Sequence, residues 1–329
     1  MGGSLSPSGW SRYQWLTVAT AVLTLVLIAV GAIVRTTDSG LGCPDWPLCH
    51  GRLIPPADKN SIIEYSHRTL AAVVGLLVVA TALVTLRTRR LDPTARALAV
   101  ASLPLLALQA WLGKVTVERE LPAEVVTFHL GTALVLLAVL ALIALLALLG
   151  EGRTTIDDPE RQTFARIALV AAAVTAGVLL IGAYVVGSGA TAACTTWPSC
   201  IEAPIPFVDG GRLTSVHWLH RITVVLGLGA VAFVAMAASQ LQAPASGVKL
   251  GGWVLVGLYV VQIAIGGLNV LTDFSDAALV AHLATGAAIW AVLVLLVVGS
   301  RLQPEPSRAG ATSMPAPSRT GEARAGTGG

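Results

Sequence analysis

The second half of this chain of 329 residues repeats its first half, and the repeat keeps unusual residues in register. The segment from Gln109 to His129 matches the segment from Gln262 to His282, and each histidine stands 20 residues after its glutamine. Leucine-rich segments resemble one another by chance, but polar residues inside them do not share a register by chance. We therefore expect the chain to fold as two copies of one unit.

Further histidines, arginines and cysteines follow the same repeat. An offset of 153 residues superimposes two His-Arg pairs, and an offset of 151 superimposes two loops of the pattern Cys-x-x-Trp-Pro-x-Cys. The matched positions are His67-Arg68 with His220-Arg221, and residues 43–49 with residues 194–200. Each half thus holds two histidines within apolar segments, which is what gripping a planar cofactor from both faces requires.

Eight stretches are apolar and long enough to cross a bilayer core of about 30 Å as helices of roughly 20 residues. The composition agrees, with 55% hydrophobic residues, 12% charged residues and a mean hydropathy of +0.77, so a soluble two-domain protein is excluded. The expected spans are 15–34, 62–86, 95–115, 123–149, 164–187, 214–238, 250–271 and 277–299. The predicted fold is an all-α integral membrane protein with eight transmembrane helices in two pseudo-symmetric four-helix bundles.

The distribution of positive charge predicts the orientation. With the N-terminus in the cytoplasm, the cytoplasmic segments hold 13 of the 21 Lys and Arg residues and the opposite side holds six. The remaining two, Arg68 and Arg221, lie within helices. Because cytoplasmic loops carry the excess of Lys and Arg, both termini are predicted to be cytoplasmic. The net charge of +3 therefore reflects topology and not nucleic-acid binding.

The spans divide the chain into five parts. The first apolar run is expected to be retained, and not cleaved as a signal peptide, because it ends in Arg35 and the repeat makes it the first helix of a half. The tail is rich in Pro, Ser, Gly and Ala and is expected to be disordered. The parts are a cytoplasmic N-terminal segment (1–14), an N-terminal half (15–149), a cytoplasmic linker (150–163), a C-terminal half (164–299) and the tail (300–329).

All four cysteines lie in the first and third outward loops, which face an oxidising compartment. Two short disulfides, Cys43–Cys49 and Cys194–Cys200, are therefore expected. A zinc site is the weaker alternative, because each loop offers only two thiols and only one loop adds a histidine, His50. A bridge over so few residues stabilises little, so a redox or loop-shaping role is at least as plausible as stapling.

The four buried histidines predict haem sites. His67 and His129 open two helices that run in the same direction, so their imidazoles lie at similar depth below the outer surface, and His220 and His282 repeat this. Two opposed imidazoles are the usual axial pair of a low-spin haem. The alternatives are four histidines hydrogen-bonded within the bundle, a structural zinc site, or a binuclear copper or iron centre. Either metal alternative needs more ligands together than one half supplies.

The residues beside these histidines are candidates for cofactor contacts. Arg68 and Arg221 directly follow their histidines, where a guanidinium could pair with haem propionates in a bidentate manner. The alternative is a hydrogen bond to the backbone or to another helix. Gln109 and Gln262, near the outer ends of their helices, could also line the two sites.

The two halves differ three residues before the first histidine of each pair. Glu64 occupies this position in the first half, whereas His217 occupies it in the second half. A spacing of three residues places each of them on the same helix face as its histidine. Glu64 is a candidate for general-base catalysis or for stabilising positive charge, and the alternative is a surface carboxylate paired with Lys59. The two sites are therefore expected to have diverged.

Several of these motifs together resemble the haem A synthase family of bacterial respiratory membranes. The loop SGLGCPDWPLCHG and the helix motif IIEYSHR are specific, and three shorter motifs agree with them. The resemblance covers residues 15–299, through segments 39–51, 62–68, 128–133, 216–221 and 281–287.

The resemblance implies an oxidoreductase that converts the C8 methyl of haem O to a formyl group by successive hydroxylations, giving haem A for cytochrome c oxidase. It implies that His67, His129 and Glu64 serve the substrate haem O, and that His220 and His282 hold a permanent haem b. The first-loop cysteine pair is implied to be functional. The implied location is the plasma membrane of a bacterium. Implied partners are haem O synthase (the farnesyltransferase that makes haem O), cytochrome c oxidase assembly factors, the lipid bilayer and further copies of the chain.

Two other functions fit paired haem sites in a membrane. One is a quinol-linked di-haem b electron carrier, and the other is a haem transporter without chemistry. The difference between Glu64 and His217 favours the enzyme, because a carrier has no reason to place a carboxylate beside only one haem.

Overall fold

The computed structural model describes residues 9–200, 203–205, 207–241 and 246–304. Within these ranges it contains eight long helices, each long and apolar enough to cross a membrane. The helices are α1 (Arg12–Thr36), α2 (Lys59–Thr88), α3 (Pro93–Glu118), α4 (Ala123–Leu149), α5 (Pro159–Gly187), α6 (Arg212–Gln240), α7 (Ser246–Leu271) and α8 (Asp276–Gly299). The predicted all-α fold with eight spans is confirmed, and the chain is a multi-pass membrane protein.

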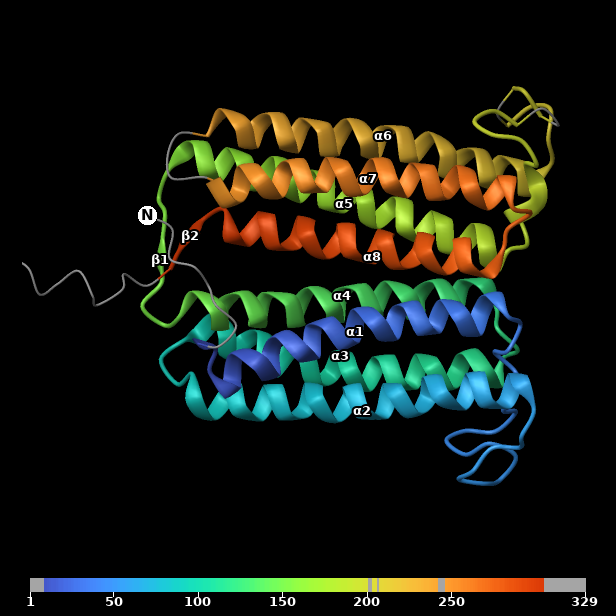
Figure 1. Cartoon of the computed structure of the whole chain (residues 1–329), viewed down its shortest axis with the longest axis horizontal. Helices are drawn as coiled ribbons and strands as arrows, with labels where there is room; N and C mark the ends of the chain where they lie inside the picture. Colours follow the sequence, from blue (N-terminus) through green and yellow to red (C-terminus); the bar gives the residue numbers. More distant parts are fainter. Residues whose placement is uncertain (1–8, 201–202, 206, 242–245, 305–329) are drawn as a thin grey trace, which may run out of the picture.

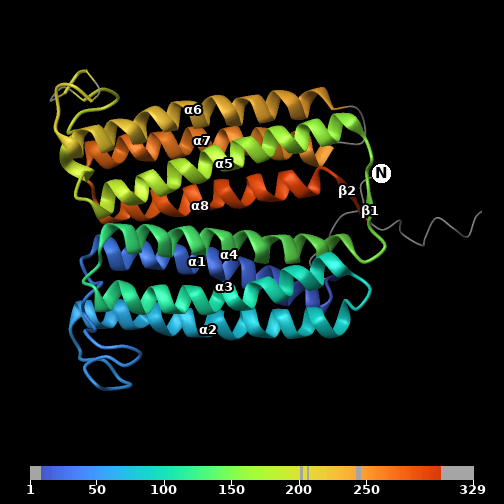
Figure 2. The ribbon, with the colours of Figure 1, turned by 180° about the vertical axis from the view of Figure 1, so that it is seen from behind.

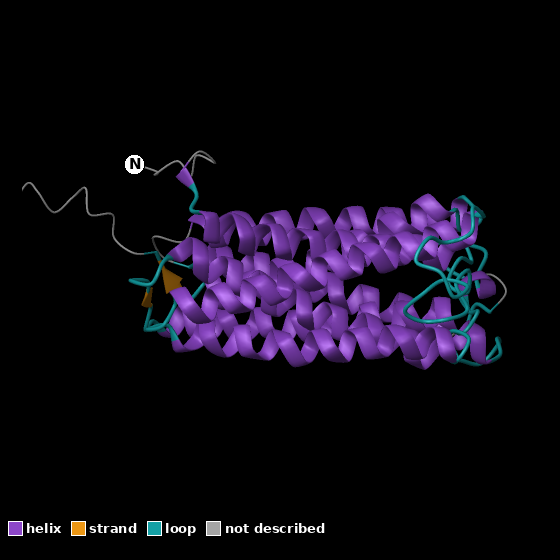
Figure 3. Cartoon of the chain, turned by 90° about the horizontal axis from the view of Figure 1, so that it is seen from below, coloured by secondary structure: helices purple, strands orange, loops and turns teal. Residues whose placement is uncertain are grey.

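The helices form two groups of four. Helices α1 to α4 lie together, and helices α5 to α8 lie beside them, as Figures 1 and 2 show from opposite sides. All of them run along the long axis of the molecule (Figure 3). The cysteine-containing loops and the short helix η2 (Thr191–Ala193) lie at one end, and the strands β1 (Thr154–Thr155) and β2 (Leu302–Gln303) lie at the other. The predicted orientation places the strand end in the cytoplasm.

Helices α1, α4, α5 and α8 join the two groups. A buried apolar cluster contains side chains from all four helices, including Ile28, Leu134, Leu179 and Ala287. Trp290 of α8 adds a hydrogen bond, because its indole N–H donates to the backbone carbonyl of Leu134 in α4 (2.9 Å). Packing contacts and interhelical hydrogen bonds are the forces that hold helices together in lipid.

Side-chain caps set where the helices begin, and a hydropathy pattern does not detect them. Helix α5 begins before the predicted span at residue 164, because the carboxylate of Asp158 accepts a hydrogen bond from the backbone N–H of Glu160 (3.0 Å). Asp58 caps α2 in the same way through the backbone N–H of Ser61 (2.9 Å), and this bond lowers the pKa of Asp58. The predicted linker of residues 150–163 is therefore partly helical.

The start of the predicted tail is ordered. Strand β2 pairs antiparallel with β1 in the linker, with Thr154 opposite Gln303 and Thr155 opposite Leu302. The backbone N–H of Ile156 also donates to the carbonyl of Arg301 (2.8 Å). Disorder from residue 300 onward was therefore the wrong expectation for residues 300–304, where backbone pairing with the linker orders the chain. Residues 305–329 of the tail and 1–8 of the N-terminal segment lie outside the described part.

The two halves differ in how their first two helices pack. In the N-terminal half, hydroxyl groups bridge α1 and α2, with Tyr13 Oη 3.1 Å from Thr85 Oγ1 and Thr20 Oγ1 2.9 Å from Thr81 Oγ1. The repeat places apolar residues at the matching positions of the C-terminal half, where they belong to its buried core: Ala171, Val234 and Ala238. The repeat therefore conserves the helix arrangement but not the chemistry of its contacts.

A buried ion pair ties the start of α3 to the linker. Asp92 caps α3 through the backbone N–H of Ala95 (3.0 Å) and accepts two contacts from Arg153, at 2.7 Å and 2.8 Å. Burial alone would raise the pKa of Asp92, but the hydrogen bonds from Arg153 and Ala95 outweigh it and lower the pKa. The ion pair therefore stabilises the fold at neutral pH, and this contribution is lost as the pH falls through the lowered pKa.

We expect Asp92→Ala to destabilise the protein by about 3 kcal/mol, because it removes a cap and leaves the Arg153 guanidinium buried without its carboxylate. Asp58→Ala is the control, since Asp58 caps α2 through the backbone N–H of Ser61 but is exposed and forms no ion pair among the described residues, and it should lose far less stability. Thermal unfolding in detergent at pH 7 measures both losses as changes in Tm. Equal losses in the two variants would contradict a special contribution from the ion pair.

Candidate functional site

Each of the four predicted histidines packs against a glycine of the preceding helix. A Cβ atom placed on any of these glycines would lie 2.9 to 3.3 Å from the histidine Cε1 atom, which is closer than ordinary contact. The pairs are Gly31 with His67, Gly113 with His129, Gly182 with His220, and Gly266 with His282. Glycine thus provides the space that each imidazole edge occupies.

The histidine rings share a second property. The Nδ1 atom of each ring is buried and has no hydrogen-bond partner among the residues that the structure describes. An unpaired polar atom in an apolar interior is unfavourable, and most buried polar side chains are hydrogen-bonded. Hydrogen bonds within the described part of the bundle therefore leave the Nδ1 atoms of all four histidines unsatisfied. The rings are available to a ligand.

The structure brings His220 and His282 together. Their ring centroids are 6.4 Å apart and their planes are inclined by 75°. Two metal–nitrogen bonds of about 2 Å each, extended by the radius of each ring, give a centroid separation of roughly 6 Å. The pair therefore fits a single metal ion between the two imidazoles, as axial haem ligation requires.

His67 and His129 occupy the matching places in the other half. His67 stands as far from the start of α2 as His220 stands from the start of α6, and His129 likewise matches His282. The rise of an α-helix puts all four rings about 9 to 12 Å from their helix starts. These helix starts lie at the end of the molecule that carries the cysteine loops (Figure 1).

The glutamines contact the second histidine of each pair, but in different ways. Gln109 Nε2 lies 3.3 Å from Nε2 of His129. Gln262 instead donates to the backbone carbonyl of His282 (2.8 Å), and its own Oε1 is buried without a partner. Both glutamines thus lie beside the second histidine of their half, and the two contacts are not chemically equivalent.

Both predicted disulfides are present, and all four cysteines are fully buried. His50 does not join a metal site, because its Nε2 lies 3.0 Å from the carbonyl oxygen of Gly42. Among the described residues, no cluster of three or more His, Cys, Asp or Glu side chains could hold a metal ion. The zinc alternative therefore finds no support in this part of the chain.

Asp45 shapes the first cysteine loop. Its carboxylate accepts hydrogen bonds from the backbone N–H groups of His50 (2.5 Å) and Gly51 (2.8 Å). The bond from Gly51 is the main reason that the pKa of Asp45 lies below its usual value. The loop is thus closed by a disulfide and by a carboxylate-to-backbone contact.

Arg68 holds the first cysteine loop against helix α2. Its guanidinium donates to the carbonyl oxygens of Asp45 (2.6 Å), Leu48 (2.7 Å) and Cys43 (2.9 Å). Since one guanidinium bonds three loop carbonyls, the position of the loop depends directly on this side chain.

Arg221 does the same in the second half. It donates to Pro198 (3.0 Å), Ser199 (2.9 Å) and Cys194 (3.4 Å). These contacts are the backbone hydrogen bonds named as the alternative for both arginines, and pairing with haem propionates stays a prediction.

Glu64 belongs to the same network as Arg68. Its side chain is 3% exposed, one oxygen accepts from the Arg68 guanidinium, and the other accepts from the backbone N–H of Cys43 (2.8 Å). Glu64 therefore pairs with Arg68 and not with Lys59. A buried carboxylate needs such partners, because an unpaired charge there is strongly unfavourable.

His217 occupies the Glu64 position of the second half and makes a different contact. Its Nδ1 lies 3.0 Å from the carbonyl oxygen of Ala190, just after the end of α5. No carboxylate thus links Arg221 to the second cysteine loop from this position. The predicted divergence between the halves is present in the hydrogen-bond network as well as in the residue type.

The role of the four glycines was not predicted from the sequence. The repeat did align Gly31 with Gly182 and Gly113 with Gly266. The sequence therefore marks these glycines as matched positions but does not indicate what they do. Only the rotation of each helix about its axis shows that they face the histidines.

We expect Gly182→Ala to displace the His220 ring, because the new methyl group would lie 2.9 Å from Cε1. Gly177→Ala is the matched control in the same helix, since a Cβ there meets nothing within 4 Å. The amount of haem retained per purified chain, measured by pigment extraction, should fall at least severalfold in Gly182→Ala and stay unchanged in the control. Equal retention in both variants would refute a steric role for Gly182.

Comparison with known proteins places this architecture in a family. Residues 14–294 match the model of the family COX15-CtaA, described as cytochrome oxidase assembly protein. The heme A synthase of Symbiobacterium thermophilum is 31% identical over 302 residues, which cover 85% of this chain and 93% of the relative. That of Shewanella oneidensis is 28% identical (87% and 96% covered), and that of Bacillus pumilus is 32% identical (80% and 86% covered). The chain belongs to the COX15-CtaA family of cytochrome oxidase assembly proteins.

Proposed function

We propose that this protein is a haem A synthase, which oxidises the C8 methyl group of haem O to a formyl group. Relatives that cover most of the chain carry the name heme A synthase. The observation that carries the proposal is the neighbouring pair His220 and His282, with ring centroids 6.4 Å apart, and its counterpart at the same distance from the helix starts in the other half. Such a protein makes the haem A that cytochrome c oxidase needs.

The two halves are proposed to hold different haems. His220 and His282 would hold a permanent haem b, which when bound supplies an electron-transfer centre. His67 and His129 would hold the substrate haem O. The contact between Gln109 and Nε2 of His129 supports this assignment. The Gln109 amide can contact this nitrogen when no haem is bound and give way to the haem iron when the substrate binds, which suits a site where substrate enters and product leaves.

Glu64 is the proposed catalytic residue of the substrate half. A carboxylate beside the reacting methyl carbon can accept a proton from an incoming oxygen nucleophile or stabilise positive charge that develops on that carbon. Arg68 and the N–H of Cys43 fix its two oxygens, so the carboxylate is oriented before the reaction begins. The Cys43–Cys49 loop is thus proposed to position the catalytic carboxylate.

The proposed setting is the plasma membrane of a bacterium, with the cysteine loops outside. Haem O synthase, which supplies the substrate, and assembly factors of cytochrome c oxidase, which receive the product, are the proposed partners. The long lipid-exposed helices are consistent with a farnesylated substrate that reaches the site from the bilayer.

Glu64→Ala should abolish conversion of haem O while leaving haem b bound, because the reacting position loses its carboxylate but the second histidine pair is untouched. Glu124→Ala is the control, since Glu124 is an exposed carboxylate in the first turn of α4 at the same end of the molecule. Chromatography of haems extracted from membranes that also contain haem O synthase measures haem A, haem O and haem b. Near-normal haem A in the Glu64 variant would exclude the proposed role.

Replacing the histidines should separate the two sites. His220→Ala is expected to lose haem b, whereas His67→Ala should keep haem b and produce no haem A. The same extraction tests the electron carrier, because a carrier would contain two haem b per chain and no haem O or haem A. Two haem b per wild-type chain would therefore overturn the proposal.

A further inference from the structure

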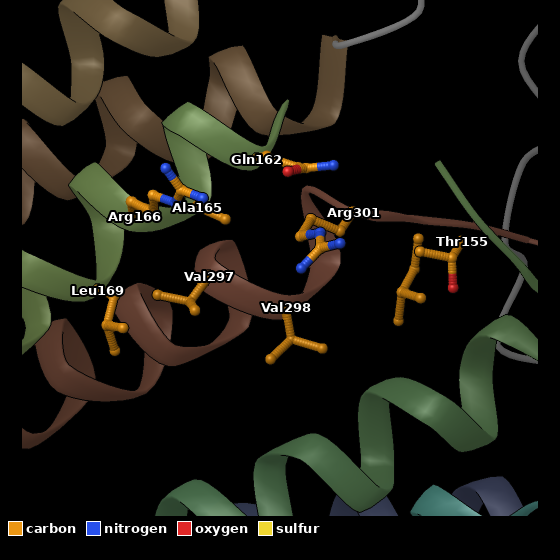
Figure 4. Close-up of a pocket in the computed structure, with 9 residues that line it drawn as sticks. Thr155, Gln162, Ala165, Arg166, Leu169, Val297, Val298 and Arg301 are labelled. Atoms are coloured by element: carbon orange, nitrogen blue, oxygen red, sulfur yellow. The ribbon is translucent and has the colours of Figure 1, made fainter. Parts of the chain in front are cut away.

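A pocket lies at the end of the molecule opposite the histidines, between the start of α5 and the end of α8, with β1 at its edge (Figure 4). Its volume is about 430 Å³. The polar part of its lining includes Thr155, Gln162 and the arginines Arg166 and Arg301, and the apolar part includes Leu169 and Val297. None of these residues belongs to the histidine sites.

The two arginines have no carboxylate partner among the described residues. Arg166 is exposed in α5 and forms no ion pair there. Arg301 lies just after α8, and its Nε atom is buried with no hydrogen-bond partner in the described part of the chain. A buried guanidinium nitrogen without a partner is unfavourable, so it favours binding of a hydrogen-bond acceptor.

A third arginine of this corner, Arg161, differs from Arg166 and Arg301 because it contacts other groups of the protein. Its guanidinium donates to the carbonyl of Ser300 (2.8 Å) and lies 4.0 Å from the Asp158 carboxylate. The neighbouring Asp157 accepts a hydrogen bond from Gln162 (2.8 Å). Among the described residues, Asp158 is therefore engaged with Arg161 and the α5 cap, and Asp157 is engaged with Gln162. Neither carboxylate pairs with Arg166 or Arg301.

The repeat indicates that the helix arrangement does not require Arg166 and Arg301. The offset of 151 residues aligns Arg166 with Trp15, and the offset of 153 residues aligns Arg301 with Leu148. The N-terminal half forms the same helix arrangement with apolar residues at both places. The positive charges are thus a property of this corner alone.

The apolar part of the pocket adjoins the bilayer. Leu169 follows Arg166 by one helical turn, and its side chain is 58% exposed on the membrane-spanning part of α5. A ligand in this pocket therefore meets guanidinium groups at one end and lipid-facing apolar side chains at the other. An amphiphile with an anionic head matches this pattern.

We propose that this pocket binds the phosphate headgroup of an anionic phospholipid of the leaflet on the strand side, which the charge distribution assigns to the cytoplasm. Arg166 and Arg301 bind the phosphate oxygens, and the acyl chains leave along Leu169. Guanidinium groups bind phosphate through charge-assisted hydrogen bonds, and arginines near the membrane surface attract anionic lipids. The bound lipid would stabilise the packing of α5, α8 and the β1–β2 pair. This proposal does not depend on the proposed catalytic activity.

The test uses the full-length protein in detergent, titrated with phosphatidylglycerol, with phosphatidylcholine of the same chains, and with inorganic phosphate. Native mass spectrometry counts bound lipid, and thermal unfolding measures stabilisation. The test variant is Arg166→Gln with Arg301→Gln. The control is Arg87→Gln with Arg90→Gln, which removes the same charge near the end of α2 and outside the pocket.

Wild type and control should bind phosphatidylglycerol in preference to phosphatidylcholine, and the test variant should bind it roughly 25-fold more weakly, or about fivefold for each arginine removed. If the double variant unfolds, the single variant Arg166→Gln, which changes an exposed residue, replaces it in the same measurement. Unchanged phosphatidylglycerol binding in the test variant would overturn the proposal. Displacement of the lipid by inorganic phosphate at equal concentration would also overturn it, because the site would then select the free anion.

Discussion

An imidazole inside an apolar helix bundle must find a partner for its nitrogen atoms, and this requirement explains the arrangement of both halves. None of the four buried histidines has a hydrogen-bond partner for its Nδ1 atom among the described residues. Their rings are nevertheless fixed, because each is pressed against a glycine of the preceding helix. Small residues usually let membrane helices approach one another, and here they make room for an imidazole ring instead.

The cysteine loops extend this rigid frame to the outer surface. In each half the arginine that follows the first histidine donates to carbonyl groups of the loop, so ring and loop are positioned from the same turn of helix. In the first half alone, Glu64 joins arginine and loop into one network. The two halves therefore share a scaffold and differ in the one acidic group that chemistry on a bound substrate would use.

Periodicity and the repeat predicted the eight spans, the depth of the histidines and both disulfides. The contacts of Arg68 were not predictable, because they depend on the conformation of an irregular loop that has no period in the sequence. The early start of α5 depends on the cap at Asp158, which lies outside the apolar pattern. The glycine contacts depend on how each helix is rotated, and in lipid the hydropathy of a uniformly apolar helix contains little information about rotation.

The contacts between the halves are those expected if a pseudo-two-fold axis parallel to the helices relates the two halves. Helix α1 packs on α8 and α4 packs on α5, which are equivalent contacts when the halves exchange places, and α4 meets α8 on the axis itself. An ancestral homodimer of a single four-helix unit would close in this way. Such a dimer would carry the same residue at positions 64 and 217. Fusion of two copies into one polypeptide removes that constraint, and it is the covalent link that allows one subunit-like half to specialise while the other keeps its original task.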